Sequence, residues 1–230
     1  HYCGVTQMKI NRLVTFGCSF MVGHGIHDTW DAEKKLSINA QFSRSKYAWV
    51  ETLGQALDLP VANQSIAGSS NKEISFLVKE FDFKEGDLAL INWTFKERSC
   101  IIGRPGTTLD DRSNFHLSIH DDNEVNRVWQ SYHVTAENLH AESIDAIYSA
   151  AWYLEKVGVP QRHLFLKDWG WQSETQGVFM KENLNIIPIS FDFSVGPRGH
   201  DGMHPSLETY TAYAQEVYEW IKENEDINKR

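Results

Sequence analysis

A serine stands directly after the first apolar run of the chain. Residues 12–16 (RLVTF) predict a buried strand, which breaks at Gly17 and is followed by Cys18 and Ser19. A strand that ends in a tight turn and presents a serine is typical of a nucleophile elbow, in which the hydroxyl is exposed above the edge of the sheet. Serines after strands are also common as turn and helix-capping residues. The stretch therefore offers a nucleophile but does not establish one by itself.

A carboxylate and an imidazole stand three residues apart near the other end of the chain. Asp201 and His204 lie in the stretch DGMHPS, before the last predicted helix. On a constrained loop the carboxylate can accept the Nδ1 proton of the imidazole, which leaves Nε2 free to act as a general base toward a serine. Taken alone, the stretch is better interpreted as an Asp-Gly turn followed by a residue that precedes a proline. Because this loop and Ser19 both follow predicted strands, a parallel sheet could bring them together.

Two further loops carry groups that could stabilise negative charge. Gly68, in NQSIAGSSN, follows the predicted strand 60–64 and could present its backbone N–H where a side chain would block a substrate. Otherwise it is a turn glycine. Asn92 and Thr94, in INWTFKER, stand at the end of the predicted strand 88–93, and either could donate a hydrogen bond to developing charge.

The rest of the sequence supplies elements that would hold these loops at one edge of a sheet. Short β-rich runs alternate with segments of helical periodicity, which is the signature of βαβ units and a mainly parallel sheet. The predicted strands are 12–16, 60–64, 88–93, 163–168 and 186–191, and the predicted helices are 47–57, 71–81, 141–157 and one after Ser206. Two segments, 21–45 and 95–135, break the alternation and are expected over the carboxyl ends of the strands, where ligands bind.

Taken in order, the chemical stretches resemble the sequence blocks of the SGNH, or GDSL-like, serine hydrolases. FGCSF is similar to the family's first block, NQSIAGSSN to its glycine block and DGMHPS to its closing Asp-x-x-His block. The resemblance implies an α/β protein with a three-layer α/β/α, flavodoxin-like fold and a mainly parallel five-stranded sheet. It also implies a single domain over residues 8–230, with insertions near 21–45 and 95–135. We expect residues 1–7 to be a remnant that precedes a natural start at Met8.

The same resemblance implies a role for each residue of a catalytic triad. Ser19 would be the nucleophile, His204 the general base, and Asp201 the group that orients the imidazole. Cys18 stands where the family usually has an aspartate, which need not abolish the chemistry because that residue is not the nucleophile.

An oxyanion hole is implied as well. It would combine the backbone N–H groups of Ser19 and Gly68 with one side chain. Alignment by motif gives Asn92 for that side chain, alignment by strand length gives Thr94, and the family's Gly-x-Asn-Asp block is absent. We take Asn92 as the first choice. The stretch NWTFKER also resembles uncharacterised GDSL-like proteins of bacteriophages, a looser likeness that says nothing about substrate.

Composition excludes several classes of function. The 230 residues carry a formal charge of −9, which argues against a broad phosphate-neutralising surface and so against nucleic acid as a partner. No apolar run approaches the roughly 20 residues of a membrane span. Three cysteines without CxxC spacing suggest neither disulfides nor a cysteine zinc site, and no secretion signal is visible. We expect a cytoplasmic or phage-associated protein that uses no cofactor or metal ion, and the sequence leaves its oligomeric state open.

The sequence therefore predicts a carboxylic ester hydrolase that works through a serine acyl-enzyme. Eight tryptophans and eight tyrosines, including DWGW at 168–171, suit stacking on sugar rings, so an acetylated carbohydrate or another small ester is the expected substrate. Three alternatives stay open: a glycan-binding or structural module of reduced activity, an acyltransferase that uses the same serine, and a metal-dependent hydrolase. The last would use the histidine clusters at 24–28, 116–121 and 200–204.

Overall fold

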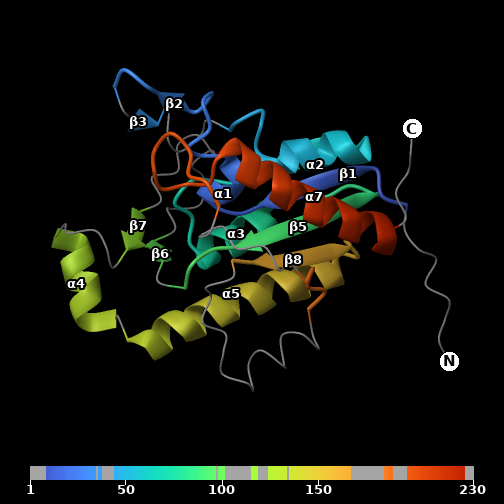
Figure 1. The fold of residues 1–230 in the computed structure, drawn as a ribbon. Coiled ribbons are helices and arrows are strands. Elements are labelled where there is room, and N and C mark those ends of the chain that lie inside the picture. Colours follow the sequence, from blue (N-terminus) through green and yellow to red (C-terminus); the bar gives the residue numbers. More distant parts are fainter. Residues whose placement is uncertain are drawn as a thin grey trace.

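The structure is a computed structural model of the chain (Figure 1). It describes residues 9–34, 36–37, 44–96, 98–101, 115–118, 124–133, 135–166, 184–188 and 196–225. The stretch DWGW at 168–171 and the predicted remnant at 1–7 lie outside these residues.

A parallel sheet forms the centre of the fold. Its four strands, in the order β4-β1-β5-β8, are β4 (Val61–Asn63), β1 (Arg12–Phe16), β5 (Asp87–Trp93) and β8 (Gln161–Phe165). Every pairing is parallel, with Leu13 opposite Val61 and Leu88, and Ile91 opposite His163. All seven residues of β5 are buried, as expected for a central strand that is covered on both faces.

Helices cover both faces of the sheet and make three layers (Figure 1). α2 (Trp49–Leu57) packs against α7 (Leu207–Asn224) on one face, and α3 (Asn71–Glu80) packs against α5 (Ala136–Lys156) on the other. Three of these helices begin at a serine or threonine whose hydroxyl accepts a backbone N–H of the first turn, namely Ser70, Thr135 and Ser206. The predicted α/β/α fold class is therefore confirmed.

Two predicted strands differ from the observed ones by more than one residue at an end. The strand predicted at 163–168 is β8, which begins at Gln161 because Gln161 and Arg162 already pair with β5. Their polar side chains have partners outside the sheet: Gln161 donates to the carbonyl of Ala151 and Arg162 pairs with Glu225. The strand predicted at 186–191 is represented by a single parallel bridge between Ile186 and His163. Residues 189–191 lie outside the described residues, so the described sheet has four strands where five were predicted.

Both segments that break the βα alternation lie beyond the carboxyl ends of the strands (Figure 1). The first contains α1 (Ser19–Val22) at its start and a two-stranded hairpin of β2 (Trp30–Asp31) and β3 (Leu36–Ser37). The second contains an antiparallel pair of β6 (Arg98–Ile101) and β7 (Phe115–Ser118), followed by α4 (Glu124–His133). They stand at the edge of the sheet where the predicted chemical residues also lie.

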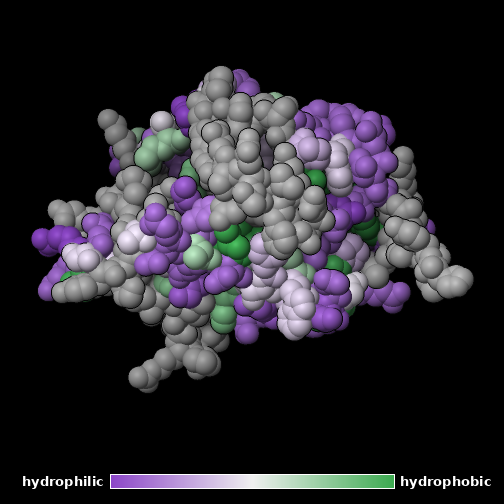
Figure 2. Space-filling model, turned by 90° about the horizontal axis from the view of Figure 1, so that it is seen from below, coloured by the Kyte–Doolittle hydropathy of each residue, from purple (hydrophilic) through white to green (hydrophobic). Residues whose placement is uncertain are grey.

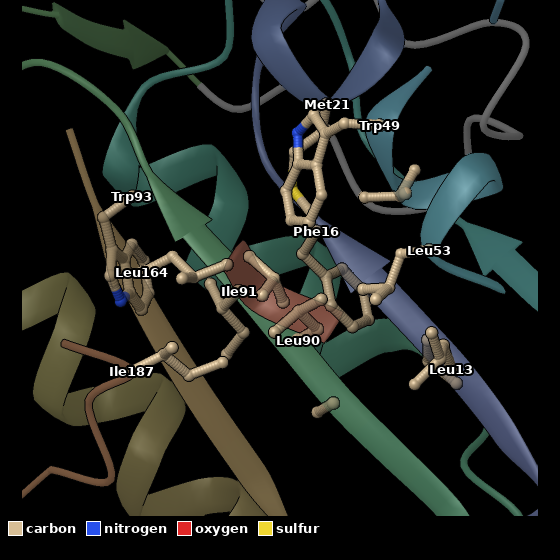
Figure 3. Close-up of a cluster of buried hydrophobic side chains, with 14 of the residues drawn as sticks. Leu13, Phe16, Met21, Trp49, Leu53, Leu90, Ile91, Trp93, Leu164 and Ile187 are labelled. Carbon is tan, nitrogen blue, oxygen red and sulfur yellow. The ribbon is translucent and has the colours of Figure 1, made fainter. Parts of the chain in front are cut away.

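The core is built from apolar side chains of the sheet and its covering helices. Figure 3 shows Leu13 and Phe16 of β1 packed near Trp49 and Leu53 of α2, while Trp93 of β5 lies against Leu164 of β8. The face below the sheet in Figure 1, seen in Figure 2, is mostly hydrophilic in its coloured part. Among the helices in the described part of the chain, none is both long and apolar enough to span a bilayer.

His163 is a fully buried titratable residue inside this core. Its Nδ1 accepts a hydrogen bond from Trp93 Nε1 at 3.0 Å, its Nε2 lies 2.9 Å from Gln161 Oε1, and its ring stacks on the Trp93 indole at an angle of 6°. Accepting at Nδ1 fixes the neutral imidazole with its proton on Nε2. Burial, with a smaller contribution from the charge of Arg162, lowers the pKa of His163 to about 3.

We expect this histidine to make the fold less stable in acid. The unfolded chain binds a proton at His163 near pH 6.5 whereas the folded chain resists it down to about pH 3, so the unfolded state gains protons first as the pH falls. The free energy of unfolding should then fall by about 1.4 kcal/mol per pH unit below pH 6.5 from this residue alone. Urea unfolding between pH 7 and pH 4 measures it, and His163→Phe should flatten the slope. An imidazole that is already protonated at pH 5 by NMR would contradict the prediction.

Candidate active site

Ser19 lies at the carboxyl end of β1, as the first residue of α1. The strand ends at Phe16, and the next position favours glycine, because a Cβ at Gly17 would lie 2.4 Å from Met21 Sδ and 3.1 Å from the carbonyl oxygen of Asn92. The close packing of Met21 on this glycine lets α1 start at once. Among the described residues, the one non-glycine with a positive φ is Asp58, so Ser19 is presented without the strained backbone of a nucleophile elbow. The residue is 4% exposed.

Asp201 and His204 lie on the loop that precedes α7. The loop is closed by a bridge between Arg198 and Pro205, by a hydrogen bond from the Gly199 N–H to the His204 carbonyl, and by one from the Arg198 guanidinium to the Met203 carbonyl. Asp201 Oδ1 accepts the backbone N–H groups of Met203 and His204, both at 2.9 Å. The carboxylate is thus held over the histidine three residues later, as the spacing predicts.

The loop and α1 meet through a chain of two hydrogen bonds. His204 Nδ1 lies 2.6 Å from Asp201 Oδ2, and His204 Nε2 lies 2.9 Å from Ser19 Oγ. A carboxylate at Nδ1 selects the imidazole with its proton on that nitrogen, so Nε2 can accept the proton of the serine hydroxyl. The three side chains are therefore brought together in the order that activates a serine.

Asp201 is held in its ionised form. Burial by itself raises the pKa of this carboxyl group, but the N–H groups of His204 and Met203 and the His204 imidazole outweigh it, so the pKa of Asp201 is lowered. The carboxylate is consequently available to His204 across the whole neutral range.

Three residues to which the sequence assigns no part in the triad pack around the Asp201 and His204 side chains. The ring of His24 packs edge-on against it with centroids 5.4 Å apart, and Phe20 does so at 5.6 Å. Gly25 packs tightly against the Asp201 loop. It has a φ of +81°, and a Cβ added to it would lie 3.0 Å from Asp201 Oδ1 and 3.1 Å from His204 Cβ. Its carbonyl also accepts the His200 N–H at 2.8 Å. These residues define the position of the Asp201 and His204 side chains from the α1 side.

Gly25→Ala should therefore lower activity as well as stability. The left-handed backbone costs an alanine about 1–2 kcal/mol, and the new methyl group must displace Asp201 or His204, for which we expect a loss of roughly tenfold or more in kcat. Gly158→Ala is the matched control, because Gly158 has a φ of +72° with no atom within 4 Å of its Cβ position. Ester hydrolysis and thermal unfolding of both variants check this. Equal activity in the two variants would show that Gly25 does not position the pair.

The predicted oxyanion residues lie on the two loops next to the Ser19 turn. The Ile66 N–H donates to the Gly17 carbonyl at 3.2 Å, which ties the glycine block to that turn, and Gly68 follows with a φ of +82°. Asn63 fixes the same loop to α1, because its Nδ2 donates to the Met21 carbonyl at 3.0 Å. The Gly68 loop is thereby held beside the nucleophile position.

Asn92, near the end of β5, and Thr94, directly after it, differ in their hydrogen bonding. The Asn92 side chain is buried, and neither its Nδ2 nor its Oδ1 has a hydrogen-bond partner in the described part of the chain. The Thr94 hydroxyl accepts from Arg98 at 3.1 Å, while both backbone polar groups of Thr94 pair with the Asn71 side chain. A buried amide without partners is costly and rare, so it marks Asn92 as the residue with a donor to spare.

The described residues of the predicted histidine clusters do not form a metal site. Asp28 accepts from the Ser45 hydroxyl and the Lys46 N–H, His27 packs on Tyr47, and His24 packs on His204. The side chain of His116, and both His120 and Asp121, lie outside what the structure describes. Within the described residues, no three histidine, cysteine, aspartate or glutamate side chains lie where they could share a metal ion.

The order of the sheet and the position of these residues define a fold class that is also seen in known proteins. No protein-family model matches the sequence, and no curated protein matches it significantly. Solved structures do match, and they place the chain among proteins with the SGNH, or GDSL-like, hydrolase fold.

Two similar structures are bacterial. One is a protein from Desulfitobacterium hafniense DCB-2 described as lipolytic and of the G-D-S-L family, with 15% identity and a TM-score of 0.50 over 91% of this chain and 99% of that one. The other is an acetyl xylan esterase from the rumen bacterium Butyrivibrio proteoclasticus, with 11% identity and a TM-score of 0.57 over 94% of this chain and 64% of the esterase. At these identities the likeness shows the fold alone, and it does not bear on the bacteriophage resemblance.

Proposed function

We propose that the chain is a serine ester hydrolase. The observation that carries the proposal is the hydrogen-bonded chain from Ser19 Oγ through the His204 imidazole to Asp201. A buried serine, a fixed imidazole and an ionised carboxylate in this order serve proton abstraction from the hydroxyl, which is the first requirement of acyl transfer. The fold adds support, because proteins described as esterases and as lipolytic share it.

The reaction would take place in two steps. His204 Nε2 accepts the Ser19 proton while Ser19 Oγ attacks the ester carbonyl, and the imidazolium then gives that proton to the departing alcohol. Water attacks the resulting acyl-enzyme with His204 as base again, which releases the acid and restores the serine. The negative oxygen of each tetrahedral intermediate would be held by the N–H groups of Ser19 and Gly68 and by the Asn92 amide, with Thr94 as the second choice for that last position.

The expected substrate is a small ester, and an acetylated carbohydrate fits best. The acetyl xylan esterase with this fold is named for such a substrate. The aromatic stretch at 168–171 that could stack on sugar rings lies outside the described residues, so the sugar part of the proposal depends on composition and on that fold neighbour.

Hydrolysis of p-nitrophenyl acetate and butyrate tests the proposal. We expect the purified protein to hydrolyse at least the acetate, and we expect a chelator to leave the rate unchanged. A metal-dependent hydrolase would lose activity on chelation. A glycan-binding module would bind oligosaccharides without any turnover. An acyltransferase would transfer acetyl to an added sugar in preference to water, so product analysis with and without a sugar acceptor separates transfer from hydrolysis.

A further inference from the structure

Arg98 lies beside the candidate active site without any role in the proposed reaction. It is the first residue of β6, four residues after Thr94, and its side chain is half-buried. One guanidinium nitrogen, Nη1, donates to Thr94 Oγ1 at 3.1 Å, and the guanidinium carbon lies 5.3 Å from the centroid of the Phe95 ring. The guanidinium is therefore fixed by a hydrogen bond and by stacking.

A series of ring contacts connects this guanidinium to the catalytic imidazole. The Phe20 ring lies 5.6 Å from the His204 ring on one side and 6.1 Å from the Phe95 ring on the other. Phe20 directly follows Ser19, and Arg98 stacks on Phe95. The rings of Phe20 and Phe95 thus connect His204 to Arg98. Arg98 lies in β6, which stands beyond the carboxyl ends of the central strands in Figure 1.

Within the part of the chain that the structure describes, no carboxylate pairs with the positive charge of Arg98. Among the described residues, the two arginine side chains of the central sheet have acidic partners, as Arg12 has Asp87 and Arg162 has Glu225, whereas Arg98 of the β6-β7 pair contacts no carboxylate. Lys96, in the same turn, is also half-buried and adds charge of the same sign. In a chain with a net charge of −9, an arginine that is half-buried, fixed in position and without a described carboxylate partner can bind an external anion.

We propose that Arg98 determines specificity by binding a carboxylate on the ester substrate. A guanidinium that is stacked on an aromatic ring and held at one nitrogen keeps its remaining N–H groups in a planar fork, which matches the two oxygens of a carboxylate. The preferred substrate is then an ester that carries a negative charge away from the scissile bond, on either the acyl chain or the alcohol. This proposal rests on the serine hydrolase function above and adds a substrate class to it.

Two matched pairs of esters test the proposal and locate the charge. Mono-p-nitrophenyl glutarate against its methyl ester places the carboxylate on the acyl side, and 4-acetoxybenzoate against methyl 4-acetoxybenzoate places it on the alcohol side. For each pair the ratio of kcat/KM, anionic over neutral, is measured in wild type and in Arg98→Met. Comparing the two proteins cancels the intrinsic reactivity of the esters. Lys84→Met is the matched control, because it removes one exposed positive charge at the opposite end of β5.

We expect the ratio to fall by about tenfold or more in Arg98→Met for one of the two pairs, because a charge-assisted pair is lost. Lys84→Met should leave the ratio unchanged, and Arg98→Lys should keep part of the preference.

If Arg98→Met does not fold, the wild-type ratio at low and at high salt decides instead, since screening should reduce that ratio. A ratio that is equal in wild type and Arg98→Met for both pairs, or insensitive to salt in that second case, overturns the proposal. A purely structural role for Arg98 would lower both esters of a pair equally. Loss of the proposed function would look different, with no ester turned over and Ser19 unreactive.

Discussion

Ser19→Ala should reduce kcat for ester hydrolysis by about four to six powers of ten, which leaves only the catalysis that the oxyanion groups and substrate binding provide. The variant removes one buried oxygen whose hydrogen-bond partner is His204 Nε2, so the fold should remain intact. The loss would arise because no covalent intermediate can form, while the imidazole and the neighbouring N–H groups stay in place. Stopped assays with p-nitrophenyl acetate, together with circular dichroism of the variant, measure this directly.

Cys18→Ala is the matched control for this experiment. Cys18 is the neighbouring buried residue and a chemically stronger nucleophile, but no hydrogen bond connects it to His204 among the described residues. We expect this variant to keep most of the activity. If Cys18→Ala were inactive and Ser19→Ala active, the assignment of the nucleophile would be wrong.

Asp201→Asn should lower kcat/KM by about three to four powers of ten at neutral pH. The amide can still accept the Met203 and His204 N–H groups through its oxygen, so the loop is expected to keep its shape. Its NH₂ group would then face His204 Nδ1, which forces that nitrogen to accept. The imidazole proton moves to Nε2 and points at Ser19, so His204 can no longer take the proton of the hydroxyl.

Asp28→Asn is the control for the loss of a carboxylate. Asp28 accepts hydrogen bonds from Ser45 and Lys46 in a neighbouring loop and has no contact with His204 in the described structure. It should show nearly wild-type activity. An Asp201→Asn enzyme within tenfold of wild type would mean that this carboxylate does not orient the catalytic base.

The sequence predicts much of the fold and the centre of the site because both follow from local patterns. Apolar runs that alternate with helical stripes identify β1, β4 and β5 and the four covering helices to within a few residues. The side chains of Ser19, Asp201 and His204 lie together because the segments that carry them follow parallel strands, whose carboxyl ends meet at one edge of the sheet. That edge is set by the topology, so residues far apart in sequence could be placed side by side.

The parts that the sequence does not predict depend on contacts between distant segments. β8 begins two residues earlier than predicted because its polar first residues pair with β5, while their side chains find partners on distant segments, at Ala151 and Glu225. Gly25 is one of fifteen glycines, and only the approach of the Asp201 loop makes it special. Arg98 likewise looks like a solvated charge until Phe95 and Thr94 are seen to hold it.

Labelling with a fluorophosphonate probe, followed by peptide mapping in a mass spectrometer, tests the central claim most directly. The probe forms a covalent bond only with a serine that a neighbouring base has activated. We predict one adduct, on Ser19, which is absent from Ser19→Ala and strongly reduced in Asp201→Asn. No adduct in the wild-type protein, or an adduct on another residue, would contradict the assignment of Ser19, His204 and Asp201 as a catalytic triad.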